Sequence, residues 1–64
     1  MQNIYYETIK RLEQMKVQRQ YILGWASGYL GNPEIEEQRM TDAWQAGYDD
    51  GKARSTDEAE NWKE

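Results

Sequence analysis

A glycine–aromatic unit occurs twice in this chain and constrains its fold more than any other feature. The first copy lies in the stretch 24–31, Gly-Trp-Ala-Ser-Gly-Tyr-Leu-Gly, and the second in 43–51, Ala-Trp-Gln-Ala-Gly-Tyr-Asp-Asp-Gly. When Trp25 is aligned with Trp44, both copies read small-Trp-x-x-Gly-Tyr, and Asn32-Pro33 lies between them. Two such units in short helical segments predict one helix folded back on another. The expected fold is therefore all-α, an antiparallel helical hairpin.

Residues 3–30 are predicted to form one long helix, because neither Gly nor Pro interrupts the chain before Gly24. Apolar and aromatic side chains recur there with a 4-3-4-3 spacing, which is typical of a helix with one buried face. The positions of this seam are Met1, Tyr5, Thr8, Leu12, Met15, Arg19, Ile22, Ala26 and Tyr29. Asn3 is the expected N-cap. The same seam is also suited to a homodimer built on the first helix.

The first helix should end near Gly31, because glycine tolerates the left-handed conformation that terminates helices. Asn32 is then the expected N-cap of a second helix over about 33–53, with Pro33 at its first position. The apolar stripe of this second helix is thin, so the helix would be marginal alone.

The C-terminal residues have two expected outcomes. Ser55 and Glu58 have the spacing of a capping box, which favours a short third helix over about 56–63 that brings Ala59 and Trp62 onto the hairpin. Alternatively, residues 55–64 fray, as the ends of small domains do. In either case residues 1–64 form a single small domain.

Glycine inside a helix costs about 1 kcal/mol relative to alanine, so Gly24, Gly28 and Gly47 need a structural reason. The natural reason is close approach of the two helices. We expect Trp25 to pack near Gly47 and Trp44 near Gly28, so that each ring covers the glycine of the other helix.

The composition argues against catalysis. The chain contains neither Cys nor His, which excludes Cys/His zinc sites and Ser-His or Cys-His pairs. Its carboxylates are better explained as solvated helix faces than as an acid–base pair, and Asp49-Asp50-Gly51 lacks the other ligands of a calcium loop. We therefore expect no enzyme activity, no cofactor, no metal and no small-molecule substrate.

The longest uncharged run, residues 20–33, contains three Gly and a Pro and is too short to cross a membrane. No basic segment leads into an apolar one, so no signal peptide is predicted. The expected location is cytoplasmic.

Charge is divided between the halves of the chain. Residues 1–33 carry a net charge of +2 and residues 34–64 a net charge of −6. The basic residues of the first half are Lys10, Arg11, Lys16 and Arg19. They have two interpretations, ordinary helix-surface charge paired with Glu7, or contact with phosphate.

Eight aromatic side chains, three Trp and five Tyr, are many for 64 residues. Trp25, Tyr29, Trp44 and Tyr48 are expected to pack inside the hairpin. Tyr5, Tyr6 and Tyr21 are less determined, and if exposed together they would mark a binding or dimer surface.

The order of these motifs resembles the ribosome modulation factor family. The resemblance covers about residues 20–53 and rests on three elements: Gly24-Trp25-x-x-Gly28-Tyr29-x-Gly31, the linker Asn32-Pro33, and Trp44-x-x-Gly47-Tyr48. Members of that family are small helical proteins that bind the small ribosomal subunit near the 3′ end of its 16S ribosomal RNA. There they block initiation and promote ribosome dimers in starved cells.

The resemblance implies a ribosome-associated translation modulator that acts without catalysis. Its expected RNA-binding residues are Lys10, Arg11, Lys16 and Arg19, joined by Arg39 from the second helix. The acidic second half supports an alternative, a small phage- or plasmid-type protein that inhibits a host protein by presenting carboxylates like a nucleic-acid backbone.

Overall fold

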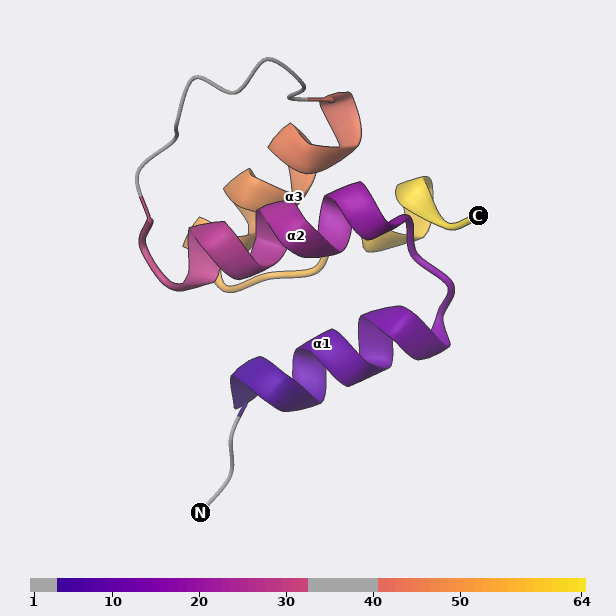
Figure 1. The fold of residues 1–64 in the computed structure, drawn as a ribbon, viewed down its shortest axis with the longest axis horizontal. Coiled ribbons are helices and arrows are strands. Elements are labelled where there is room, and N and C mark those ends of the chain that lie inside the picture. Colours follow the sequence, from indigo (N-terminus) through magenta and orange to yellow (C-terminus); the bar gives the residue numbers. More distant parts are fainter. Residues whose placement is uncertain (1–3, 33–40) are drawn as a thin grey trace.

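The computed structural model describes residues 4–32 and 41–64, and the regular structure in these ranges is helical (Figure 1). The elements are α1 (Ile4–Gln14), α2 (Arg19–Tyr29), α3 (Asp42–Ala53) and the short 3-10 helix η1 (Ala59–Trp62). The predicted all-α class is therefore confirmed. Asn3, Pro33 and Arg39 lie outside the described residues, and so does the first part of the predicted second helix.

The prediction of one continuous helix over 3–30 is wrong, because the chain turns between α1 and α2. Lys16 takes a left-handed φ of 63°. The Val17 N–H donates to the carbonyl of Leu12 (3.1 Å) and the Lys16 N–H to that of Glu13 (3.0 Å). This pair of bonds is a Schellman motif, which closes a helix end, and Leu12 and Val17 are both buried in the core. The turn contains neither Gly nor Pro, and the 4-3-4-3 spacing continues through it, so periodicity did not reveal it.

The other two helices end in the same way. Gly31 has φ 76° and Arg54 has φ 58°, and each occupies the left-handed position of its own Schellman motif. The closing bonds run from Asn32 N–H to Ser27 (3.0 Å) and from Ser55 N–H to Asp50 (2.8 Å). The predicted end of a helix at Gly31 is thus confirmed.

The second predicted helix starts later than expected. Thr41 is extended and its hydroxyl oxygen accepts the Trp44 N–H (3.1 Å), so α3 begins at Asp42 with Thr41 as its N-cap. Asn32 does not cap this helix. Its carbonyl oxygen instead accepts a hydrogen bond from the hydroxyl of Tyr48.

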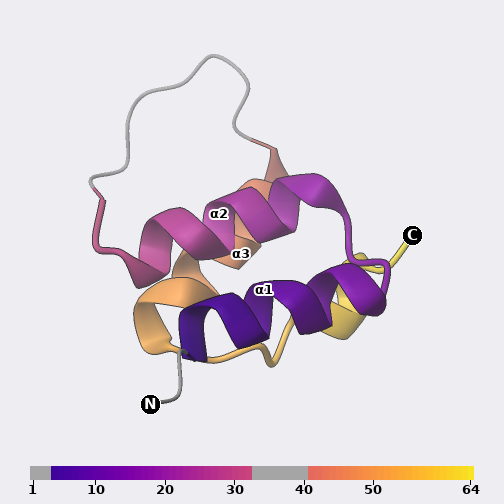
Figure 2. The same ribbon diagram turned by 60° about the horizontal axis from the view of Figure 1, so that its bottom comes forward.

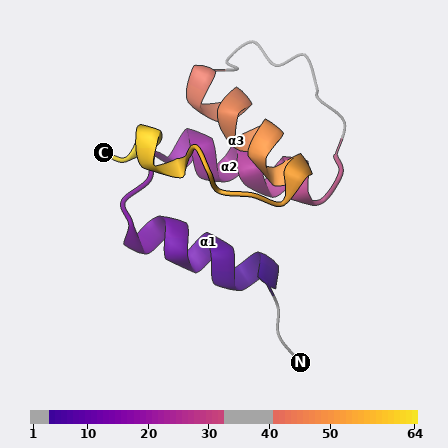
Figure 3. The same ribbon diagram turned by 180° about the vertical axis from the view of Figure 1, so that it is seen from behind.

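The predicted pairing of the two motif-bearing helices is confirmed, because α2 packs directly against α3. Their direction, however, is parallel (Figures 1 and 3). Gly24 lies against the backbone of Trp44 and Tyr48, whereas Gly28, one turn later, lies against Tyr48 and Lys52. Contacts therefore advance along both helices together, and an antiparallel hairpin would reverse this order.

The contacts between α2 and α3 are also reciprocal. Gly24 meets the carbonyl of Trp44, and Gly47 meets that of Tyr21. Gly28 meets the carbonyl of Tyr48, and Gly51 meets that of Trp25. Such exchange of equivalent contacts is what a local two-fold axis along the helix pair produces. It equates residue i with residue i+23, so the structural repeat is aromatic-x-x-Gly-aromatic-x-x-Gly, residues 21–28 and 44–51. Aligning Trp25 with Trp44 placed this repeat in the wrong register.

The prediction that each tryptophan ring covers a glycine of the other helix is wrong. The glycines instead let the backbones of α2 and α3 come into contact. A Cβ atom on any of the four interface glycines, Gly24, Gly28, Gly47 and Gly51, would lie 2.0–2.2 Å from a carbonyl oxygen of the other helix. Each glycine thus directs a Cα–H at that oxygen, a weak hydrogen bond worth about 0.5–1 kcal/mol. The indole of Trp25 is buried, at 2% exposure, but it lies against α1 and the C-terminal segment.

Helix α1 runs antiparallel to α2 (Figures 1 and 2). It packs on a different face of α2 from the face that contacts α3. The core between these elements contains Leu12, Val17, Tyr21, Trp25, Ala43 and Ala59.

The C-terminal segment, residues 55–64, is held against this core. The Trp25 indole N–H donates to the carbonyl of Ser55 (2.9 Å), and an Asp50 carboxylate oxygen accepts the Glu58 N–H (2.9 Å). An isolated β-bridge then joins Val17 to Lys63. Of the two expected outcomes, the short helix is the one observed, reduced to the four residues of η1.

Candidate functional site

Four aromatic rings gather where the start of α1 crosses the end of α2. Trp25 and Tyr29 stack with ring centroids 4.9 Å apart, and Tyr5 lies 6.0 Å from Trp25 and 5.5 Å from Tyr29. Tyr6 meets Tyr5 edge-on at 5.0 Å and is 65% exposed. Tyr5 and Tyr6 thus extend the packed pair Trp25–Tyr29 to the surface, but Tyr21 is fully buried, so Tyr5, Tyr6 and Tyr21 are not exposed together.

Two arginines flank this cluster on one side and define what we call the Arg11–Arg54 groove. The guanidinium of Arg54 lies 5.1 Å from the centroid of the Tyr29 ring, a cation–π geometry. Arg11 donates to the hydroxyl of Thr56 (3.3 Å), which draws it toward the same segment. Trp25 and Tyr29 line the groove between them, and Glu7 is its acidic member.

Arg54 is not among the RNA-binding residues predicted from the sequence, because it lies in the acidic half of the chain and belongs to no motif. Its place follows from the end of α3. The left-handed turn at Arg54 directs the chain back across α2, and this brings its side chain over Tyr29.

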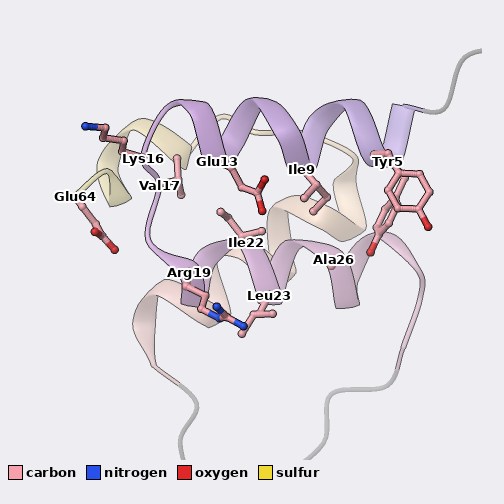
Figure 4. A pocket seen from close by; sticks show the side chains of 11 residues that line it. Tyr5, Ile9, Glu13, Lys16, Val17, Arg19, Ile22, Leu23, Ala26 and Glu64 are labelled. Carbon is pink, nitrogen blue, oxygen red and sulfur yellow. The ribbon is translucent and has the colours of Figure 1, made fainter.

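The predicted RNA-binding residues are all exposed where the structure describes them, but they do not form one patch. Arg11 lies in the groove just described. Lys16 and Arg19 line a second groove between α1 and α2, together with Glu13 and Glu64 (Figure 4). Lys10 lines neither of these two grooves.

The residues of the glycine–aromatic motif are structural. Gly24, Gly28 and Gly47 join the helices, and Gly31 terminates α2. Trp44 is half-buried and stacks on Tyr48 at 5.0 Å, and the ammonium group of Lys52 lies 5.5 Å from the Tyr48 ring.

Tyr21 and Asp50 form a polar contact inside the helix pair that no sequence motif predicts. The Tyr21 hydroxyl donates to Asp50 Oδ2 (2.6 Å), and the Tyr21 side chain is fully buried. Burial, followed by the hydrogen bond to Asp50 and the charge of that carboxylate, raises the pKa of Tyr21 well above its ordinary value. Because Oδ2 also accepts the Glu58 N–H, Asp50 connects α2, α3 and the C-terminal segment.

Within residues 4–32 and 41–64, no group of three or more acidic side chains is placed to hold a metal ion. In the same ranges, no helix is long and apolar enough to cross a bilayer. The exposed groups of these residues include cations beside aromatic rings, and carboxylates.

Comparison of the chain with protein families, with curated proteins and with solved structures yields no match. The fold and the two grooves are thus the basis for assigning a function.

Proposed function

We propose that this protein is a non-catalytic, ribosome-associated modulator of translation that binds RNA of the small ribosomal subunit. The observation that carries the proposal is the Arg11–Arg54 groove. Two exposed guanidinium groups there lie beside the stacked pair Trp25–Tyr29. Guanidinium groups bind phosphate, and a half-buried ring beside them offers a surface for an unpaired base.

The glycine-paired helices support the same proposal. The residues on which the resemblance to ribosome modulation factors rests are those that join α2 to α3 and end α2, so the motif defines a compact unit in this chain. The groove is built on that unit, because Tyr29 belongs to α2 and Arg54 follows α3 directly.

Co-sedimentation with purified small ribosomal subunits tests the proposal. Binding should weaken as salt rises, because each phosphate contact releases counterions. Arg11→Ala and Arg54→Ala should each weaken binding and make the logarithmic salt dependence shallower by about one unit. Lys63→Ala, which removes an exposed cation outside both grooves, is the matched control and should leave binding nearly unchanged. Absence of binding at low salt, or binding that is indifferent to salt, would contradict the proposal.

A second function is favoured by the exposed acidic side chains of α3 and the C-terminal segment. These are Asp42, Asp49, Asp57, Glu58, Glu60 and Glu64. Such a surface suits a basic protein partner, as in an inhibitor that imitates a nucleic-acid backbone. Capture of one basic protein that survives nuclease treatment and is lost in Asp49→Lys would support this function. Capture that nuclease abolishes would exclude it.

A further inference from the structure

The second groove, between α1 and α2, presents an apolar surface bounded by opposite charges (Figure 4). It has a volume of about 530 Å³. Ile9 lines it from α1, and Ile22 and Leu23 line it from α2. Leu23 is 43% exposed and Tyr6 is 65% exposed, so large apolar groups at the groove remain open to water.

Four charged side chains line this groove, two acidic and two basic, and they gather at the end away from Tyr5: Glu13, Lys16, Arg19 and Glu64 (Figure 4). Glu13 extends from α1, and Arg19 lies at the start of α2 (Figure 4). Because α1 and α2 run antiparallel, the end of α1 lies beside the start of α2, and the two side chains occupy the same end of the groove. Both are exposed and thus available to a partner.

We propose that this groove is the interface of a homodimer, in which a second copy of the chain docks about a two-fold axis along the groove. That axis places α1 of each copy over α2 of the other. Glu13 of one copy then meets Arg19 of the second copy, and the same pair forms again on the other side of the axis. Leu23 and Tyr6 become buried in the same step, which supplies the apolar core of the interface.

The charge pattern selects this arrangement. A two-fold axis across the groove would instead place Glu13 and Arg19 of one copy against the Tyr6 end of the other, where neither charge finds an opposite one. Burying charges without partners is strongly unfavourable. The groove is therefore complementary to a second copy of itself in one orientation. Such self-complementarity favours a second copy of this chain as the occupant.

The homodimer goes beyond the proposed function and does not depend on it. The dimer covers Arg19, whereas the Arg11–Arg54 groove lies elsewhere and remains open. Loss of dimerisation and loss of RNA binding can thus be measured separately.

Sedimentation equilibrium over a concentration series at low salt tests the dimer. The wild-type mass should rise with concentration from 7.6 kDa toward twice that value. Leu23→Glu, Glu13→Arg and Arg19→Glu should each keep the mass at that of one chain, because they place a charge in the apolar core or set like charges opposite each other. The double variant Glu13→Arg/Arg19→Glu restores opposite charges and should restore the dimer. Lys10→Glu, on α1 but outside the groove, is the control and should leave it intact.

Circular dichroism shows whether each variant is folded. If a single variant is unfolded, the double variant Glu13→Arg/Arg19→Glu tests the proposal in its place. A wild-type chain that stays monomeric throughout the series would overturn the proposal. A Leu23→Glu protein that still dimerises would also overturn it. The same holds for a folded Glu13→Arg/Arg19→Glu double variant that stays monomeric. If a foreign amphipathic helix binds the groove of a monomeric wild-type protein, the groove serves a different partner and the dimer is also wrong.

Discussion

Replacement of Gly47 by alanine should strongly destabilise the protein, although alanine is the better helix former. In the structure, a Cβ at this position would lie 2.0 Å from the carbonyl oxygen of Tyr21 and 2.9 Å from the nitrogen of Trp25. Ordinary van der Waals contact begins near 3.4 Å, so α2 and α3 would have to separate by about 1.4 Å. The atoms in the way belong to the backbone of a helix, which cannot move aside as the end of a flexible side chain can.

The magnitude follows from three terms. Overpacking a tight interface costs about 1–3 kcal/mol, and the upper end applies here because the whole helix pair must separate. Loss of the Cα–H contact to Tyr21 adds about 0.5–1 kcal/mol. The higher helix propensity of alanine returns about 1 kcal/mol. The net expectation is a loss of about 2–3 kcal/mol, which for a domain of this size lowers Tm by about 10–20 °C.

Thermal unfolding followed by circular dichroism measures this change. Gly31→Ala is the matched control, because Gly31 has φ 76° and nothing within 4 Å of its Cβ position. It should cost only the left-handed backbone energy, about 1 kcal/mol. Gly24, Gly28 and Gly51 make equivalent contacts and should respond to alanine as Gly47 does. A Gly47→Ala protein that melts at or above the wild-type temperature would refute the backbone contact.

Three further variants test the supporting contacts. The pKa of Tyr21 is raised in the folded state, so the contribution of Tyr21 to stability is complete below pH 10 and is lost above pH 10. Above pH 10 the free energy of unfolding should fall by up to about 1.4 kcal/mol per pH unit. Tyr21→Phe should remove this part of the slope in alkaline denaturation. Asp50→Ala leaves the buried Tyr21 hydroxyl and the Glu58 N–H without their acceptor and should cost about 1–3 kcal/mol in urea unfolding, whereas Asp49→Ala should cost far less. Lys16→Gly relieves the left-handed φ of 63° and should raise the unfolding free energy by up to about 1 kcal/mol; a loss would show that the turn depends on the lysine side chain.

The predictions of the fold that the structure confirms rest mainly on the positions of glycine. Glycines inside helices predicted close approach, and Gly31 predicted a helix end, since both inferences rest on the missing Cβ atom. The second pair, Gly47 and Gly51, was present at the same four-residue spacing as Gly24 and Gly28. Alignment of these two glycine pairs gives the register of the repeat that the structure shows, whereas alignment of Trp25 with Trp44 does not.

The break between α1 and α2 could not be read in the same way. A left-handed Lys16 is unfavourable by itself, and its turn is fixed by distant groups. The Gln18 N–H donates to the carbonyl of Trp62 (2.9 Å), and the Glu64 N–H donates to that of Lys16 (2.7 Å). Local propensity contains no trace of such tertiary bonds. The direction of α3 was hidden for a related reason, because it depends on which faces of the two helices meet.

The candidate site was predicted in part. The basic side chains of the first half are exposed as expected, but the fold divides them between two grooves and adds Arg54. Helix periodicity cannot place a residue that follows a left-handed turn, so the partner of Arg11 was visible only in three dimensions.

The parallel helix pair is the central claim, and proton–proton nuclear Overhauser effects from the glycine Hα atoms test it most directly. Parallel pairing predicts cross-peaks from Gly24 to Trp44 and Tyr48, and from Gly28 to Tyr48 and Lys52. Cross-peaks from Gly24 to Lys52 and from Gly28 to Trp44 would reverse the order along α3. That result would contradict the parallel pairing and the two-fold repeat derived from it.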